Sequence, residues 1–175
     1  MSITIRKAEP KDAPALGHVQ VTSWRSAFRN IAPDDYLDNH ASEENQAADW
    51  NEILTSSEQI VYVAEAEGKL IGYVWAYREK DETIDWDAEL TSLHLLPQYK
   101  RKGLGKALMS TAAQELKNRG CESLYLWVLD DNRNAVEFYN ALGGTRGTTR
   151  TIDLGGNHVT ETIYSWNKIE ELILG

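Results

Sequence analysis

The segment SLHLLPQYKRKGLGKALM, Ser92 to Met109, contains three features in immediate succession. Alternating apolar residues predict a strand over residues 89–96, which Pro97 ends. A turn rich in glycine and cations follows, and a helix is then predicted over residues 104–119, with Gly120 as its stop. The apolar face of this helix consists of Leu104, Leu108, Ala112 and Leu116. The segment therefore predicts a strand that leads through a short cationic turn into an amphipathic helix.

Positive charge is concentrated in this turn, although the whole chain is acidic with a formal net charge of -9 at pH 7. Lysine and arginine stabilise the C-terminal end of a helix and oppose the dipole at its start, so helix stability does not account for them here. The free N–H groups of a helix start, approached through glycines, form a cradle for phosphate. The turn therefore predicts a site for a phosphate-bearing ligand, and its cations are Lys100, Arg101, Lys102 and Lys106.

Two well-known phosphate motifs are excluded. The chain has no Gly-x4-Gly-Lys-Ser/Thr sequence, so it contains no P-loop. Gly103-Leu104-Gly105 continues without the third glycine of a dinucleotide-binding fingerprint. A Gly-x-Gly turn by itself favours a solvated connection between strand and helix, so the phosphate-site interpretation depends on the rest of the sequence.

Periodicity and turn signals extend the prediction to the remaining chain. Further strands are predicted over residues 3–8, 59–66, 70–78, 123–129, 145–154 and 159–166. Further helices are predicted over residues 12–28, 33–37, 42–54 and 132–142. No linker or repeat divides the sequence, so residues 1–175 are predicted to form one α/β (α+β) domain with a mixed sheet.

Composition narrows the function class. Hydrophobic residues make up 42% of the chain and charged residues 26%, which is typical of a globular protein. The single cysteine, Cys121, fits a reducing cytoplasm, and neither a secretory signal nor a bilayer-spanning run is present. The acidic balance argues against nucleic-acid binding, because the phosphate backbone would be repelled. The four histidines are scattered without ligand spacing, so no metal site is predicted.

A second stretch, DDNRNAVEFYNALGG (Asp130 to Gly144), follows one strand after the predicted helix. Together with Ser92 to Met109 it resembles the paired signatures of the GNAT superfamily of N-acetyltransferases, and the resemblance extends over residues 60–166. It implies a single-domain GNAT-like fold, with a mixed, mostly antiparallel central sheet whose splayed strands are flanked by helices. It also implies that acetyl-CoA is the acetyl donor.

The same resemblance implies where the donor binds. The pantetheine arm would bond to the backbone of Leu93, His94 and Leu95 as an added strand. Asn132 would contact the arm, and Tyr139 would point its hydroxyl at the thioester sulfur. Lys100 stands where the family usually has arginine or glutamine. The pyrophosphate would rest on N–H groups of the turn, from Arg101, Lys102, Gly103, Leu104, Gly105 and Lys106.

Acetyl transfer to an amine needs an acid for the departing thiolate and a neutral amine. Tyr139 is the predicted general acid, although its place on an apolar helical stripe is also explained by packing. Glu89 is the predicted base, with a solvated strand start as the alternative. Some family members place a glutamate at the position of Trp127, so that base is absent. His94 is better explained as a strand histidine whose hydrogen bonds are satisfied. An amine that arrives in its neutral form would need no base.

The predicted function is direct acetyl transfer from acetyl-CoA to a primary amine of a small molecule or peptide, within a ternary complex. A non-catalytic acyl-CoA sensor is the alternative, supported by Trp127 and by Gly144, where the family usually has an aromatic residue. A general nucleotide-binding module is a third reading. The last hairpin and the tail KIEELILG, residues 168–175, favour either a homodimer or a cap over the monomer's core.

Overall fold

The computed structural model describes residues 2–40 and 42–174, so Met1, Ala41 and the last residue of the predicted tail, Gly175, lie outside the described residues. The strands are β1 (Ile3–Lys7), β2 (Gln59–Ala66), β3 (Lys69–Arg78), β4 (Ala88–Leu95), β5 (Leu124–Leu129), β6 (Thr145–Leu154) and β7 (Asn157–Trp166). The α-helices are α1 (Ala13–Phe28), α2 (Asp34–His40), α3 (Glu43–Thr55), α4 (Leu104–Asn118) and α5 (Arg133–Ala141). Short 3-10 turns are η1 (Pro10–Asp12), η2 (Pro97–Tyr99) and η3 (Ile169–Leu172).

The element order confirms the prediction from sequence, and most bounds agree within two residues. The clearest difference is α2, which runs over Asp34–His40 rather than 33–37. Pro33 precedes the helix and accepts a hydrogen bond from the N–H of Leu37 through its carbonyl group. Asp34 and Asp35 then occupy the first turn, where the helix dipole favours negative charge.

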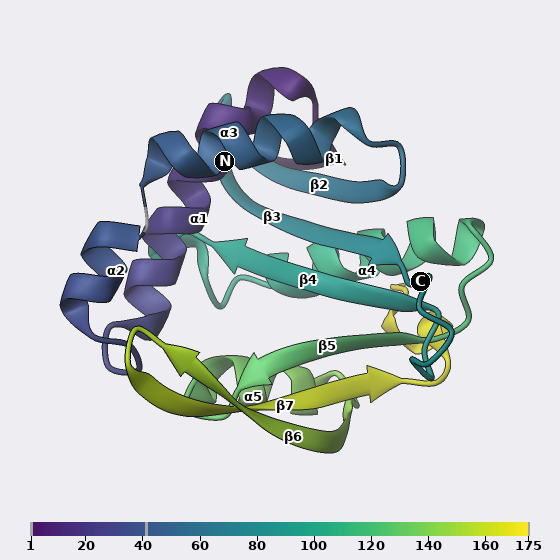
Figure 1. Cartoon of the computed structure of the whole chain (residues 1–175). Helices are drawn as coiled ribbons and strands as arrows, with labels where there is room; N and C mark the ends of the chain where they lie inside the picture. The colour runs from purple at the N-terminus through teal and green to yellow at the C-terminus, as the bar shows by residue number, and fades with distance from the viewer. Residues whose placement is uncertain (1, 41, 175) are drawn as a thin grey trace.

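The strands form one sheet in the order β1-β2-β3-β4-β5-β7-β6, and its neighbours are antiparallel except for β4 and β5. This parallel pair shares a single matched position, Glu89 opposite Tyr125. Figure 1 shows β4 and β5 diverging from that point toward their carboxyl ends. The mixed, mostly antiparallel sheet with splayed strands is therefore confirmed.

Helices cover both faces of the sheet (Figure 1). On one face, Trp50 of α3 and Leu16 of α1 pack onto Val63 and Tyr73. On the other face, the predicted apolar stripe of α4 packs on β2, β3 and β4, with Leu108, Ala112 and Leu116 fully buried there. Sheet and helices thus enclose a core on each face of the sheet, and a smaller buried cluster of Ile31, Leu129 and Val159 adjoins the end of β5.

The tail folds back onto the same core. Ile169 and Leu172 of η3 are buried in the α4 core, and the N–H of Leu174 donates to Ser110 Oγ of α4 at 2.7 Å. Of the two predicted roles of the tail, the structure therefore contains the cap over the monomer's core. The homodimer stays a prediction.

A partly buried ion pair fixes the first strand to η1, directly before the first helix. Arg6 on β1 donates from Nη1 and Nη2 to the two carboxylate oxygens of Asp12 at 2.7 and 2.9 Å. The backbone N–H of Glu9 donates to the same carboxylate at 2.8 Å. The hydrogen bonds from Arg6 lower the pKa of Asp12 below its ordinary value. This carboxylate therefore stabilises the fold only while it is ionised.

We expect Asp12→Asn to lower the free energy of unfolding at neutral pH by roughly 2 kcal/mol, because charge-assisted hydrogen bonds are lost. The folded pKa lies below the unfolded one, so the contribution is present above the unfolded pKa of about 3.9 and is lost as the pH falls through the folded value. Urea denaturation between neutral and acidic pH measures both effects. Glu9→Gln, which breaks an exposed pair with Lys11, is the control and should leave the midpoint unchanged. An Asp12→Asn deficit that persists undiminished in acid would contradict the assignment.

Candidate active site

The gap between β4 and β5 leaves one edge of β4 without a neighbouring strand. On its other edge β4 pairs with β3 along its whole length. Beyond Glu89 no position of β4 is matched to β5. The register with β3 shifts between Leu90 and Ser92, so Thr91 is an extra residue that bends the strand. The bend and the missing neighbour together open the gap.

The closed end of this gap is held by Asp87, just before β4. Its Oδ2 accepts hydrogen bonds from the N–H groups of Glu122 and Ser123 at 2.8 and 3.0 Å, directly before β5. The hydrogen bond from Glu122 is the main reason that the pKa of Asp87 is lowered. The two strands are thus tied together at one end and separate at the other.

The direction of the backbone along the open edge follows from one hydrogen bond. The N–H of Leu96 donates to Ile71 O at 2.9 Å, toward β3. Because backbone groups alternate along a strand, those of His94 also face β3, while those of Leu93 and Leu95 face the gap. Of the three predicted backbone contacts to pantetheine, the geometry favours Leu93 and Leu95.

The open edge ends at the start of α4. The turn after η2 contains two residues in the left-handed region, Arg101 with φ 60° and Gly103 with φ 80°. No side chain caps α4, and the first N–H that returns to Gly103 O belongs to Ala107 at 3.1 Å. The N–H groups before Ala107 therefore lack helical partners and point outward from the helix start. This is the geometry of an anion site.

The four cations of the turn make no ion pair within the described part of the chain, where the ion pairs involve other residues. Lys102 lies over the ring of Tyr99, with Nζ 5.3 Å from the ring centre. Desolvation lowers the pKa of Lys100, although the residue as a whole is exposed. An acidic protein thus presents uncompensated positive charge at one helix start, which attracts an anion there.

Helix α5 approaches this turn closely. A Cβ at Gly105 would lie 3.3 Å from Phe138 Cζ, so the glycine allows α5 to pack against the start of α4. Asn132 caps α5, and its side-chain oxygen accepts a hydrogen bond from the Ala135 N–H at 3.4 Å. The structure therefore gives Asn132 a local role in positioning α5, and its predicted contact with a cofactor stays a prediction.

Tyr139 lies on α5 in an aromatic cluster with Phe138, Tyr164 and Trp166. The residue is buried, and burial raises the pKa of its hydroxyl well above the ordinary value. Within residues 2–40 and 42–174 the hydroxyl has no hydrogen-bond partner. Its oxygen is nevertheless not fully enclosed by the protein. Gly144 makes the cluster possible, since a Cβ there would lie 2.8 Å from Trp166 Cζ2. Packing explains the ring of Tyr139 but leaves its hydroxyl free to donate.

Glu89 lies at the closed end of the gap and is not simply a solvated residue. Its Oε2 accepts hydrogen bonds from the hydroxyls of Tyr77 at 2.5 Å and Tyr125 at 2.8 Å. The Tyr125 hydroxyl also lies 2.9 Å from Oε2 of Glu79. Sequence reasoning missed the two partners of Glu89, because Tyr77, Glu89 and Tyr125 come together only through the register of three strands.

The side chains of His94 and Trp127 both contact other side chains. His94 Nδ1 lies 3.0 Å from Ser23 Oγ of α1, and burial, with a smaller effect of Lys100, lowers the pKa of His94 to about 4. The imidazole is therefore neutral at pH 7, in agreement with a satisfied strand histidine. Trp127 is covered by the guanidinium of Arg150, 3.9 Å from the ring centre.

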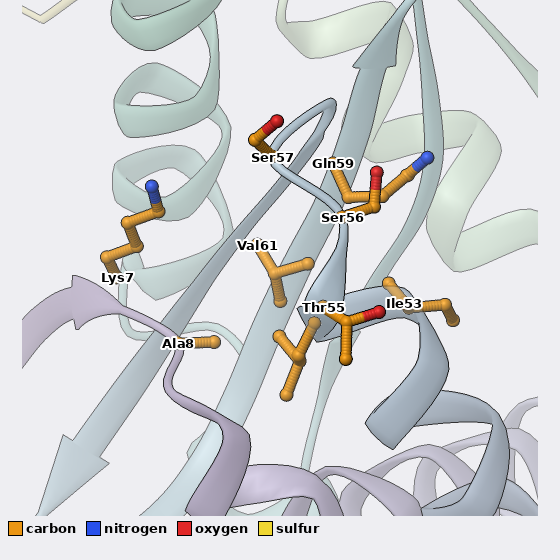
Figure 2. A pocket seen from close by; sticks show the side chains of 9 residues that line it. Lys7, Ala8, Ile53, Thr55, Ser56, Ser57, Gln59 and Val61 are labelled. Carbon is orange, nitrogen blue, oxygen red and sulfur yellow. The ribbon is translucent and has the colours of Figure 1, made fainter.

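Two shallow hollows lie apart from this gap. One, of about 180 Å³, is lined by residues of β1, the end of α3 and the start of β2, among them Lys7, Ile53 and Gln59 (Figure 2). The other, of about 290 Å³, adjoins Tyr77 and Glu79. Neither hollow is lined by Tyr139 or by a residue of the cationic turn. The candidate active site is therefore placed from the geometry of β4 and β5 and not from these hollows. The described helices include none long and apolar enough to cross a membrane.

The fold that holds this splayed parallel pair and uncapped, cationic helix start is similar to that of an N-acetyltransferase solved in complex with coenzyme A. The chain belongs to the acetyltransferase (GNAT) family, whose model matches residues 24–143.

Individual relatives agree with this membership. YuaI, an uncharacterised N-acetyltransferase of Bacillus subtilis, is 29% identical over 171 residues, covering 97% of this chain and 96% of the relative. The spermidine N(1)-acetyltransferase of Thermoplasma acidophilum is 30% identical over 143 residues, covering 79% of this chain and 86% of that protein. The structure of the PaiA N-acetyltransferase from T. acidophilum, in complex with coenzyme A, has a TM-score of 0.75 and 26% identity, covering 92% of this chain and 98% of that one.

Gly103→Ala tests the turn, with Gly68→Ala as the matched control. Both glycines have positive φ, 80° and 76°, and neither has a neighbour within 4 Å of an added Cβ. Each substitution should therefore cost about 1 kcal/mol of stability through backbone strain. We expect only Gly103→Ala to weaken binding of coenzyme A in calorimetry, because its methyl group enters the approach to the helix start. Equal affinities of the two variants would contradict a donor site at this turn.

Proposed function

We propose that the protein transfers an acetyl group from acetyl-CoA to a primary amine by direct attack within a ternary complex. The observation that carries the proposal is the unpaired edge of β4, which leads directly to the uncapped start of α4. The pantetheine arm lies along the edge and bonds to Leu93 and Leu95, as a further strand would. The pyrophosphate rests on N–H groups between Arg101 and Lys106, while the cations offset its charge.

The chemistry requires one bond to form and one to break. The amine nitrogen attacks the thioester carbonyl carbon, and the tetrahedral intermediate collapses as the C–S bond breaks. The departing thiolate takes a proton from the Tyr139 hydroxyl, and the tyrosinate regains one when the attacking nitrogen loses its extra proton to become an amide. Because the pKa of Tyr139 is raised by burial, this acid stays protonated throughout the ordinary pH range.

Glu89 removes the proton from an incoming ammonium group, through a water molecule. The two tyrosine hydroxyls that bond to its carboxylate hold it in a fixed orientation at the closed end of the gap. Holding both reactants in place provides much of the remaining acceleration. Trp127 and His94 take no part in proton transfer, since the one is covered by Arg150 and the other is bonded to Ser23.

The acceptor is a primary amine of a small molecule or a peptide. The spermidine acetyltransferase among the relatives and the acidic character of this chain make a polyamine the first compound to test. A panel of spermidine, a peptide with a free amino terminus and a lysine peptide, assayed by free thiol release from acetyl-CoA, separates these classes. Tight binding of acetyl-CoA without turnover of any amine, including simple alkylamines, would favour the non-catalytic sensor instead.

Tyr139→Phe removes the acid and keeps the ring in the aromatic cluster. We expect kcat to fall by about 10²-fold or more, with the Kd for acetyl-CoA nearly unchanged. Tyr164→Phe is the matched control, since Tyr164 lies in the same cluster and should retain wild-type turnover. An unchanged kcat in Tyr139→Phe would exclude the acid role.

Glu89→Gln tests the base. We expect kcat to fall by about 10²-fold near neutral pH, where the acceptor amine is charged. The deficit should shrink as the pH rises toward the pKa of the amine, because a neutral amine needs no base. A pH–rate profile of both proteins measures this, and a deficit that is constant over the whole range would show that Glu89 only supports the structure.

A further inference from the structure

We propose that Tyr125 and Glu79 form a proton relay that carries the proton taken up by Glu89 out of the active site to the surface. The inference rests on the proposed role of Glu89 as base. Tyr125 and Glu79 act through Glu89 and do not touch the substrate. Neither residue belongs to the two sequence signatures of the family.

The geometry that points to the relay is a hydroxyl shared between two carboxylates. The Tyr125 hydroxyl lies 2.8 Å from Oε2 of Glu89 and 2.9 Å from Oε2 of Glu79. A phenol has one hydrogen to donate, so it satisfies only one carboxylate at a time when both are ionised. The other contact becomes a hydrogen bond only when a proton sits on that carboxylate. Both contacts of the Tyr125 hydroxyl are therefore hydrogen bonds only when one extra proton is bound. That proton can be held by the carboxylate of Glu89 or by that of Glu79.

The transfer balances without any further reactant. Glu89 receives a proton from the ammonium group of the acceptor and becomes a neutral carboxylic acid. It then donates this proton to the oxygen of Tyr125 while the original phenolic proton moves to Glu79. Glu89 is ionised again, Tyr125 is neutral before and after, and Glu79 releases the proton to water. Burial and the two carboxylates raise the pKa of Tyr125, which disfavours a free tyrosinate and favours a concerted exchange.

The far end of the relay opens to solvent. Glu79 follows β3, and its Oε1 accepts hydrogen bonds from the N–H groups of Lys80 and Asp81 at 2.8 and 3.0 Å. These bonds leave Oε2 directed at Tyr125. The same residue lines the hollow of about 290 Å³, together with Tyr77 and Lys80. Tyr125 itself is buried and covered by the ring of Trp86 at 5.4 Å, so the path has one enclosed step and one exposed end.

The groups that face Glu89 provide the internal control. They are Tyr77 on β3 and Tyr125 on β5, with Glu79 behind Tyr125. Tyr77 donates to Glu89 and interacts with Tyr125, but among the described residues it makes no hydrogen bond to the Glu79 carboxylate, so its hydroxyl orients Glu89 and is not the shared bridge. Removing its hydroxyl therefore perturbs Glu89 without interrupting the path.

The experiment compares Tyr125→Phe, Glu79→Gln and Tyr77→Phe in the full chain. Acetyl transfer to the three amines of the panel is followed by free thiol release at saturating acetyl-CoA. The pH and the concentration of a small buffer, imidazole, are varied. With the relay cut, we expect kcat in dilute buffer to fall by about tenfold in Tyr125→Phe and Glu79→Gln, part of the contribution of a general base. Imidazole should restore kcat in both variants, because the buffer carries the proton away from Glu89 in place of Tyr125 and Glu79.

Tyr77→Phe and the wild type should show no dependence on imidazole. The melting temperature and the Kd for acetyl-CoA, measured on every variant, identify a protein that has lost its fold, and Glu79→Gln changes only a partly exposed side chain. Turnover of Tyr125→Phe and Glu79→Gln that is independent of imidazole would overturn the relay, as would equal imidazole dependence in Tyr77→Phe.

The same experiment separates this inference from the function on which it rests. If the wild type acetylates no amine of the panel, both fall. If the wild type is active and Glu89→Gln is impaired, while Tyr125→Phe and Glu79→Gln behave as the wild type does at every imidazole concentration, the relay alone is wrong.

Discussion

The structure depends on one parallel strand pair that is matched at a single position. A strand edge normally bonds to a neighbour, and an unpaired edge in the middle of a sheet exposes donors and acceptors that attract an extended chain. Here β4 has β3 on one side and, beyond Glu89, an open edge on the other. The bend at Thr91 and the ties from Asp87 keep this edge open at one end only. The proposed donor site lies along this edge, and the proposed base Glu89 lies at its closed end.

The second organising contact joins the two signature segments. Gly105 lies against Phe138, so that the start of α4 and the body of α5 approach within van der Waals distance. The neighbour of Phe138 is Tyr139, whose ring is held by Tyr164 and Trp166. A small residue in the turn that would bind phosphate therefore also determines where the tyrosine hydroxyl lies. The two signatures are separate in sequence but form one packed unit in the fold.

Local signals allowed much of this to be predicted from the sequence. The cationic glycine turn, the stripe of α4 and the place of Tyr139 on α5 are all contained within single segments, where periodicity and helix-end chemistry are informative. The partners of Glu89 were not predictable, because Tyr77, Tyr125 and Glu79 meet through strand register, which the extra residue Thr91 shifts by one. The family resemblance implied a cofactor contact for Asn132, which stays a prediction, and the structure adds that this residue caps α5.

The ties made by Asp87 have a mechanical consequence. The sheet consists of two leaves, β1 to β4 and β5 to β7, and near the closed end they are joined by the Glu89–Tyr125 match and by hydrogen bonds from Glu122 and Ser123 to one carboxylate. Any widening of the gap to admit a ligand must therefore rotate one leaf relative to the other, with the joined end as the hinge. The open ends then move most and Glu89 moves least. The proposed proton acceptor would then keep its position while the open end of the gap adapts to a ligand.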